Sequence, residues 1–435
     1  MSNRVRNQFV RDIFSVVLSR ISIMIIGFVG SAILARFLGP TNKGIVTTIL
    51  VIPNILITFA ELGVRQSATY CLGKRLYVDR DVISTIALLT LCTSILGSII
   101  VLSSYIIGGF QKDYGWSILI LAIMLVPLKI SLSYSNGIIL GKKQIHIYTR
   151  GSLIITFSYL IILSILVGSR SIEPKTAVIA ELIACFVGVV YILIHVKGYG
   201  AIRIRYIQGL PQRFLRLGFA YALALFILNL NYDVDIVLLE RISTSHEVGI
   251  YSIGVSFAEL LWLVPTALSM VNFVHSASAD DPVAHTQRTV RILRLVLWIA
   301  LPLMGLSYLS APLIIPLIFG EAYQDSSAVV RAILPGIWIS LVFKVLNSDL
   351  AGRGQPYAAL WVYTIALIIN ICLNLWLIPR YGAVGSAWAS SASYFFGALI
   401  FAVMYAKMSS LSITSLFLPS RVDFRRLYLA VSNNA

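Results

Sequence analysis

The sequence predicts an all-α polytopic membrane protein whose twelve transmembrane helices form two parallel six-helix lobes. Hydrophobic residues make up 58% of the 435 residues and charged residues only 12%, which is too little charge to cover the surface of a soluble protein. A membrane-spanning helix needs about 20 apolar residues, and twelve such runs follow one another with short connections. Two short signatures also occur twice, as in transporters built from a duplicated half.

The first six runs form the N-terminal lobe, which we predict over residues 1–196. They cover residues 12–35, 44–63, 82–107, 116–140, 148–167 and 177–196. The first run follows a basic segment and so resembles a signal peptide. Its counterpart in the second half is internal and cannot be cleaved, so we expect the first helix to be retained. Pro53 and Pro127 lie within runs, where proline kinks a membrane helix.

The other six runs form the C-terminal lobe, which we predict over residues 214–405. They cover residues 214–239, 248–274, 295–318, 329–350, 357–378 and 384–405. The stretch 197–213 between the lobes is basic and contains glycine and proline, so we predict a cytoplasmic linker there. Residues 406–435 are predicted to form a basic cytoplasmic tail.

The duplication is carried by two signatures. The first recurs 205 positions later, with Leu34, Arg36, Gly44 and Ile45 matching Leu239, Arg241, Gly249 and Ile250. The second recurs 211 positions later, with Asn136, Gly141 and Gln144 matching Asn347, Gly352 and Gln355. Six spans separate the members of each pair. An even number of crossings preserves orientation, so the halves are predicted to be related by an axis along the membrane normal.

The net charge of +16 is interpreted as a topology signal rather than as the mark of a nucleic-acid-binding protein. When the connections are assigned alternately to the two faces from a cytoplasmic N-terminus, most Lys and Arg residues outside the spans fall on the cytoplasmic side. This distribution follows the positive-inside rule. We therefore expect both termini in the cytoplasm, a membrane as the environment, and no nucleic acid partner.

Three cations lie within predicted spans and are the first candidates for substrate binding: Arg20, Lys129 and Lys344. A charge near the centre of a span costs about 2.5 to 3.5 kcal/mol on insertion scales, so each needs a partner or a watery cavity. The functional interpretation is a cationic cavity between the lobes that accepts an anionic ligand such as a phosphate group. The alternative is snorkelling or internal salt bridges, for example with Glu259.

Two of these cations, both lysines, belong to polar stripes, and the stripes lie at corresponding places in the two halves. The first stripe, with the helical spacing i, i+4, i+7, consists of Lys129, Ser133 and Asn136. Its counterpart consists of Ser340, Lys344 and Asn347. Each stripe places its lysine at nearly the same depth, so we predict that both stripes line the cavity.

The acidic residues within spans have two interpretations. Glu259 lies in the middle of a run, and its counterpart in the first half is Asn54, so both halves carry a polar group there. Glu259 is the first candidate for a coupling-ion site, with a structural salt bridge as the alternative; Asp235 is a second candidate for either role. The other acids lie near run ends, where we expect capping or interfacial solvation: Asp12, Glu61, Glu181 and Asp349.

Nothing in the sequence indicates an enzyme or a bound cofactor. It contains no Walker A loop, no HExxH motif and no CxxC motif. The four cysteines lack the spacing of metal ligands or redox pairs, and we interpret them as small core residues. The expected cofactor is none, and coupling to protons or to sodium stays open.

Four stretches occur in an order that is specific, although each is degenerate alone. They are Leu34-Ala35-Arg36-Phe37-Leu38-Gly39-Pro40 with Gly44, the turn Glu61-Leu62-Gly63, Asp235-Ile236-Val237-Leu238-Leu239 with Gly249-Ile250-Tyr251, and Asn370-Ile371-Cys372-Leu373-Asn374 through Pro379-Arg380-Tyr381-Gly382 to Gly385. Over roughly residues 10–405, the chain resembles the polysaccharide (O-antigen or capsule) flippase family of the multidrug/oligosaccharidyl-lipid/polysaccharide exporter superfamily.

This resemblance implies twelve helices in two lobes that form a V around a central cationic cavity. It also implies that the protein flips an undecaprenyl-diphosphate-linked oligosaccharide outward across the bacterial inner membrane by alternating access. A lipid-linked oligosaccharide is then the substrate, and a polysaccharide polymerase and chain-length proteins are expected partners. Asp235 matches the family pattern, whereas Asp233 is an addition to it.

Two other functions are weighed against this one. A cation-coupled multidrug exporter of the same fold would have an acidic, aromatic cavity rather than three central cations. A membrane glycosyltransferase or polymerase usually needs a sizeable outer loop that carries catalytic residues, and all the predicted outer loops are short. The sequence leaves open the sugar composition, the type of polysaccharide, the coupling ion and the oligomeric state.

Overall fold

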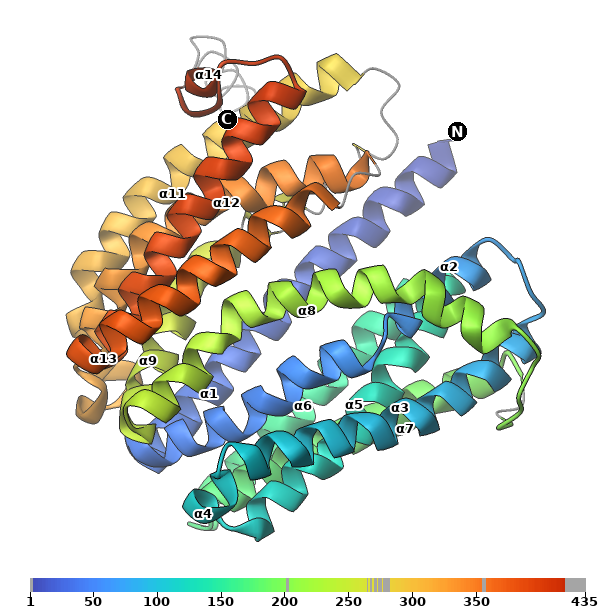
Figure 1. The fold of residues 1–435 in the computed structure, drawn as a ribbon, viewed down its shortest axis with the longest axis horizontal. Coiled ribbons are helices and arrows are strands. Elements are labelled where there is room, and N and C mark those ends of the chain that lie inside the picture. Colours follow the sequence, from blue (N-terminus) through green and yellow to red (C-terminus); the bar gives the residue numbers. More distant parts are fainter. Residues whose placement is uncertain are drawn as a thin grey trace. The chain divides into compact units, whose positions relative to one another are not determined.

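The computed structural model describes residues 3–200, 203–263, 282–353 and 357–418, together with isolated residues between positions 265 and 276. Every regular element in this part of the chain is a helix (Figure 1). The α-helices are α1 (Asn3–Ala60), α2 (Val64–Gly73), α3 (Asp79–Ile107), α4 (Phe110–Tyr114), α5 (Trp116–Gly141), α6 (Ile145–Gly168), α7 (Pro174–Lys197), α8 (Leu210–Ile242), α9 (Ser245–Ala258), α11 (Pro282–Phe319), α12 (Ser326–Gly352), α13 (Tyr357–Met408) and α14 (Ile413–Phe417). Two 3-10 helices, η1 (Glu259–Trp262) and η2 (Glu321–Tyr323), complete the set.

Among the described residues, 9 helices are long and apolar enough to cross a membrane. Two of them, α1 and α13, each contain two of the predicted spans. Their backbones leave helical geometry at one glycine each, with φ 72° at Gly39 and φ 52° at Gly382. Only glycine adopts such positive φ values without strain. The predicted all-helical, multi-span membrane fold is confirmed.

Local sequence explains where several helices begin. Pro174 is the first residue of α7, where its missing N–H costs nothing. The N-cap residue Glu173 and the third helical residue Thr176 form a capping box around Pro174. In it the Glu173 backbone N–H donates to Thr176 Oγ1 at 2.8 Å. The left-handed residue Gly209 precedes α8.

The chain divides into two compact units, of which the first comprises Met1–Ser252 and Ile318–Gly320. Within this unit α5 packs against α2, α3 and α7, and α1 packs against α6 and α8. The phenols of two fully buried tyrosines are satisfied by backbone carbonyls: Tyr105 donates to Ile49 and Tyr134 donates to Glu61, both at 2.8 Å. The core is therefore apolar with satisfied polar tips.

The second unit comprises Ile253–Leu317 and Glu321–Ala435. In this unit α12 packs tightly against α13, where a Cβ on Gly336 would lie 2.3 Å from Ser391 Cα. The Ser391 hydroxyl donates to the carbonyl of Ala332 at 2.6 Å and accepts from the N–H of Gly336 at 3.2 Å. Small residues thus allow close contact between these helices.

Along the chain, the first long stretch of unit 1 ends at Ser252, whereas the repeat predicts a lobe boundary in the linker 197–213. The difference comes from α8, which packs on α1 and α2 in the first unit. There Gly63 and Gly218 approach so closely that a Cβ on Gly63 would lie 2.0 Å from the Gly218 carbonyl oxygen. The lobes 1–196 and 214–405, the linker and the tail 406–435 stay predictions from the repeat.

Candidate functional site

Lys129 on α5 is half-buried in the first unit and contacts two other helices. Its Nζ donates to Asn54 Oδ1 of α1 at 2.8 Å and lies 3.1 Å from Glu181 Oε1 of α7. The Lys129 and Glu181 side chains are 20% and 21% exposed. The prediction that Glu181 serves as a cap or interfacial residue was wrong, because its carboxylate compensates the lysine charge.

The other members of the first stripe, Ser133 and Asn136, are half-buried on the same helix. Ser133 hydrogen-bonds the carboxyl group of Glu61. The Oδ1 atom of Asn136 is buried, and no hydrogen-bond partner for it occurs among the described residues. The stripe is therefore a polar track on α5, with one acceptor available to a ligand or to water.

In the second unit, Lys344 and Ser340 of α12 meet at one aromatic side chain. The Lys344 ammonium lies 3.8 Å from the centroid of the Trp262 ring, a distance typical of a cation–π interaction. The indole N–H of Trp262 donates to Ser340 Oγ at 3.1 Å. Asn347, one turn beyond Lys344, is half-buried. These contacts confirm that Ser340 and Lys344 share a face of α12.

Glu259 opens the 3-10 helix η1, which also carries Trp262. The predicted continuous helix over 248–274 is therefore corrected: α9 ends at Ala258 and the chain tightens into η1. Short 3-10 stretches inside a helix often mark functional hinges. Here the change of helix type lies beside Lys344. Glu259 itself is half-buried, as expected for a charge that retains some solvent.

Asp235 on α8 is fully buried and accepts a hydrogen bond from the Tyr251 hydroxyl at 2.6 Å. Both residues belong to the same stretch of the family motif, so the motif pairs them in space. Arg20, by contrast, is exposed on α1. The structure thus groups Lys129 with Asn54 and Glu181, groups Ser340 with Lys344 and Trp262, and places Arg20 on the surface of its helix.

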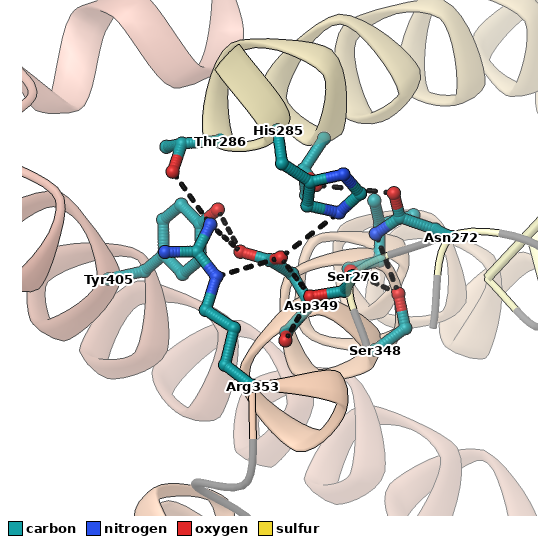
Figure 2. Close-up of polar contacts among 10 residues, drawn as sticks. Asn272, Ser276, His285, Thr286, Ser348, Asp349, Arg353 and Tyr405 are labelled. Carbon is teal, nitrogen blue, oxygen red and sulfur yellow. Dashed lines mark hydrogen bonds and ion pairs between the residues drawn. The ribbon is translucent and has the colours of Figure 1, made fainter. Parts of the chain in front are cut away.

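A buried network around Asp349 was missed at the sequence level. Figure 2 shows the Asp349 carboxylate surrounded by polar side chains of α11 and α13, of Arg353 at the C-terminal end of its own helix, and of the segment before α11. The donors and their distances are Ser276 Oγ at 2.7 Å, Tyr405 Oη at 2.6 Å, Arg353 Nη2 at 2.6 Å and Arg353 Nε at 3.0 Å. His285 Nε2 lies 3.3 Å from Asp349 Oδ1, within the range of an ion pair when the imidazole is protonated. Asp349 is 0% exposed, so its prediction as a capping or interfacial residue was wrong.

In the repeat, Arg353 of this network corresponds to a basic residue of the first unit. Arg353 lies within the second signature, directly after Gly352, and the residue 211 positions earlier is Lys142. Arg353 donates to Thr286 in the first turns of α11 at 2.6 Å, and Lys142 forms an ion pair with Asp79 at the start of α3. In both halves, a cation within the second signature contacts the start of a neighbouring helix. The repeat could have indicated this correspondence but not the partners.

The two copies of the first signature pack directly against each other. A Cβ on Gly44 would lie 1.7 Å from the carbonyl oxygen of Ser245, and one on Gly249 would lie 2.0 Å from that of Pro40. Gly44 and Gly249 are counterparts in the repeat, so the contact is reciprocal. Only residues without a side chain permit this approach.

A carboxylate beside this contact joins three further segments. Glu240 accepts hydrogen bonds from Ser245 Oγ at 2.7 Å, from Thr48 Oγ1 at 3.1 Å and from the Tyr114 hydroxyl. Burial and then the hydrogen bond to Glu240 raise the pKa of Tyr114 above its ordinary value. The phenol therefore stays a donor, and the cluster fixes α4 and α9 to α1.

The chain matches the protein-family model described as polysaccharide biosynthesis protein over residues 9–273. A protein of Shigella flexneri described as an O-antigen transporter is 22% identical over 177 residues, which are 40% of this chain. The match spans 42% of that relative's length.

Solved structures of two kinds share the fold. The lipid II flippase MurJ in an inward closed conformation matches with a TM-score of 0.76 at 15% identity, covering 92% of this chain and 88% of that chain. An inward-facing multidrug resistance MATE family transporter of the MOP superfamily matches with a TM-score of 0.71 at 15% identity, covering 92% of this chain and 98% of that chain. The fold is thus that of membrane transporters and flippases.

Proposed function

Because the chain belongs to the polysaccharide biosynthesis protein family, we propose that it flips an undecaprenyl-diphosphate-linked oligosaccharide across the bacterial inner membrane. The oligosaccharide is the repeat unit of O-antigen or of another surface polysaccharide, and it moves from the inner to the outer leaflet by alternating access. Both termini are cytoplasmic in this proposal. The family, the multi-span fold and the relative described as an O-antigen transporter support it.

The observation that carries the proposal is the pair of lysine-bearing stripes on α5 and α12. Lys129 and Lys344 lie within membrane helices, each in one copy of the stripe, and Lys344 matches Ser133, one turn from Lys129. The Lys129 ammonium contacts Asn54 of α1, and the Lys344 ammonium contacts the ring of Trp262. A diphosphate is the part of the substrate that needs cations inside the membrane. Lys129 and Lys344 would each donate to phosphate oxygens, and Asn136 and Asn347 would add neutral polar groups.

The membrane potential supplies a driving force that needs no nucleotide. An inside-negative potential of 100 mV favours the outward movement of a headgroup of charge −2 by up to about 4.6 kcal/mol. The protein is therefore proposed as a transporter rather than an enzyme, with no cofactor. A polysaccharide polymerase and chain-length proteins, which use the flipped product, are the expected partners.

A multidrug exporter is the second candidate function, because MATE structures share the fold. The central cations count against it, since a cationic drug would meet Lys129 and Lys344 as like charges. Deletion of the gene separates the two functions. Loss of surface polysaccharide with unchanged drug resistance supports flipping, whereas changed drug resistance with normal polysaccharide supports drug export.

The test of the flippase uses Lys344. We expect Lys344→Ala to abolish surface polysaccharide at a normal level of protein in the membrane, because the headgroup loses a charged ligand inside the membrane. Lys344→Arg keeps the charge and is expected to keep most of the polysaccharide. Immunoblots of the protein and gels of extracted polysaccharide measure both quantities. Normal polysaccharide in the alanine variant would contradict the proposed function.

A further inference from the structure

The ion pair of Lys129 with Glu181 has a consequence for the binding of a diphosphate. The Lys129 ammonium lies 3.1 Å from Glu181 Oε1 and donates to Asn54 at 2.8 Å, so two of its three N–H groups face protein acceptors. A diphosphate that binds Lys129 must therefore approach the Glu181 carboxylate. Two anionic groups then share one cation in a partly buried site.

Such sharing is unfavourable for a buried carboxylate. When the cation of a buried pair is withdrawn, the carboxylate is left as an uncompensated charge in a medium of low polarity. An anion within a few ångströms adds repulsion of like charges. Both effects favour the protonated form of the carboxyl group, as in other sites where two acidic groups lie close together.

The groups around Glu181 offer no second cation among the contacts that the structure shows. Lys129 approaches from α5, and the phenol of Tyr159 on α6 interacts with the Glu181 charge. On α7 itself the Cys185 thiol lies 3.9 Å from Oε1. From α1 the neutral amide of Asn54 contacts Lys129. Once Lys129 turns to a phosphate, Glu181 faces a phenol, a thiol and an amide.

We propose that Glu181 takes up one proton from water when a diphosphate headgroup binds to Lys129, and releases it when the headgroup leaves. This inference rests on the proposed function and names the group that balances charge at its site. Lys129 stays charged and transfers its hydrogen bond from Glu181 to a phosphate oxygen. The carboxylate becomes a carboxylic acid, and no covalent bond to the substrate is made or broken.

The experiment measures proton uptake on binding, with the purified full-length protein in lipid nanodiscs. The probe is N-acetylglucosamine linked through a diphosphate to farnesol, because a diphosphate diester does not titrate near neutral pH. Calorimetry at one pH in two buffers with different heats of ionisation counts the protons. We expect about one proton per bound probe over the pH range in which Glu181 is ionised in the free protein and protonated in the complex. Within that range, binding should tighten about tenfold for each unit of falling pH, since proton uptake is linked to affinity.

Two substitutions on α7 make the matched pair. Glu181→Gln keeps the shape and removes the titrating group, so we expect it to bind the probe without proton uptake and with a Kd that does not change with pH. Glu173→Gln makes the same change at the exposed N-cap of the helix and should behave like the wild type. Proton uptake by Glu181→Gln equal to that of the wild type, or binding without uptake by the wild type, would overturn the proposal.

A third variant separates this proposal from the function on which it rests. Lys129→Ala is expected to lose affinity for the probe, and wild-type affinity in this variant would contradict the role of Lys129 in the proposed function. If Glu181→Gln does not fold, infrared difference spectra of the wild type with carbon-13-labelled glutamate replace it. Probe binding should then produce the band of a protonated glutamate side chain, and the absence of that band would reject the proposal.

Discussion

Charged side chains inside the helices are compensated by partners on other helices or at the end of the same helix. Lys129 has Glu181 and Asn54, and Asp349 has Arg353 and His285. A buried charge that loses its partner is strongly destabilising, although a complete pair adds little net stability. Each of these contacts therefore makes the fold depend on a pairing between helices.

The Asp349 network gives a direct test of this dependence. We expect Asp349→Ala to destabilise the protein by up to about 3 kcal/mol, because Arg353 and His285 lose their carboxylate. The cost stays below that of a fully buried cation because Arg353 is 25% exposed. Thermal unfolding in detergent measures the effect. The control is Asp113→Ala, whose partly exposed ion pair with Arg241 should contribute less than about 1 kcal/mol; equal melting temperatures for the two variants would contradict the prediction.

The sequence predicted which residues share a face of one helix but not which helices meet. Spacing along α5 and α12 was enough to group Lys129 with Ser133 and Ser340 with Lys344. The partner of Lys129 depends on which face α7 turns toward α5. The spacing of residues along α5 carries no information about that face. For the same reason, Glu181 and Asp349 looked like residues of helix ends.

At the level of elements, the sequence predicted the order of the helices along the chain, but not which helices contact one another. The breaks at Gly39 and Gly382 separate spans that the apolar runs also separate. The repeat did not indicate that its two glycine signatures contact each other, because sequence similarity between two segments does not require contact. It also gave no sign of the 3-10 helix at Glu259, since the apolar run continues through it.

The reciprocal contact predicts that Gly44 and Gly249 do not tolerate a larger side chain. We expect Gly249→Ala to lower the melting temperature, because a Cβ would lie 2.0 Å from the Pro40 carbonyl and overpacking typically costs about 1 to 3 kcal/mol. Gly27→Ala on α1 is the control, since no atom lies within 4 Å of its Cβ position. Alanine there is expected to be neutral or stabilising. A melting temperature of Gly249→Ala equal to that of the wild type would contradict the close contact.

At the scale of the whole molecule, the proposed function has the basic charge of the protein and the membrane potential act on the same substrate. The net charge of +16 is placed by the positive-inside rule mainly on the cytoplasmic side in the predicted topology. In the proposed function, that face would attract an anionic headgroup before it enters the membrane. The membrane potential would then favour the outward movement of the headgroup, so the same basic residues would serve both insertion of the protein and capture of its substrate.

The proton proposed for Glu181 changes how strongly the potential acts. If one proton moves with a headgroup of charge −2, the net charge moved is −1, and 100 mV contributes about 2.3 kcal/mol instead of about 4.6. Glu181→Gln moves the headgroup without the proton. We therefore expect the leaflet ratio of a fluorescent farnesyl-diphosphate-linked sugar, in proteoliposomes with potassium diffusion potentials set by valinomycin, to depend on voltage about twice as steeply in Glu181→Gln as in the wild type. Glu173→Gln should keep the wild-type slope, and equal slopes for Glu181→Gln and the wild type would show that no proton travels with the headgroup.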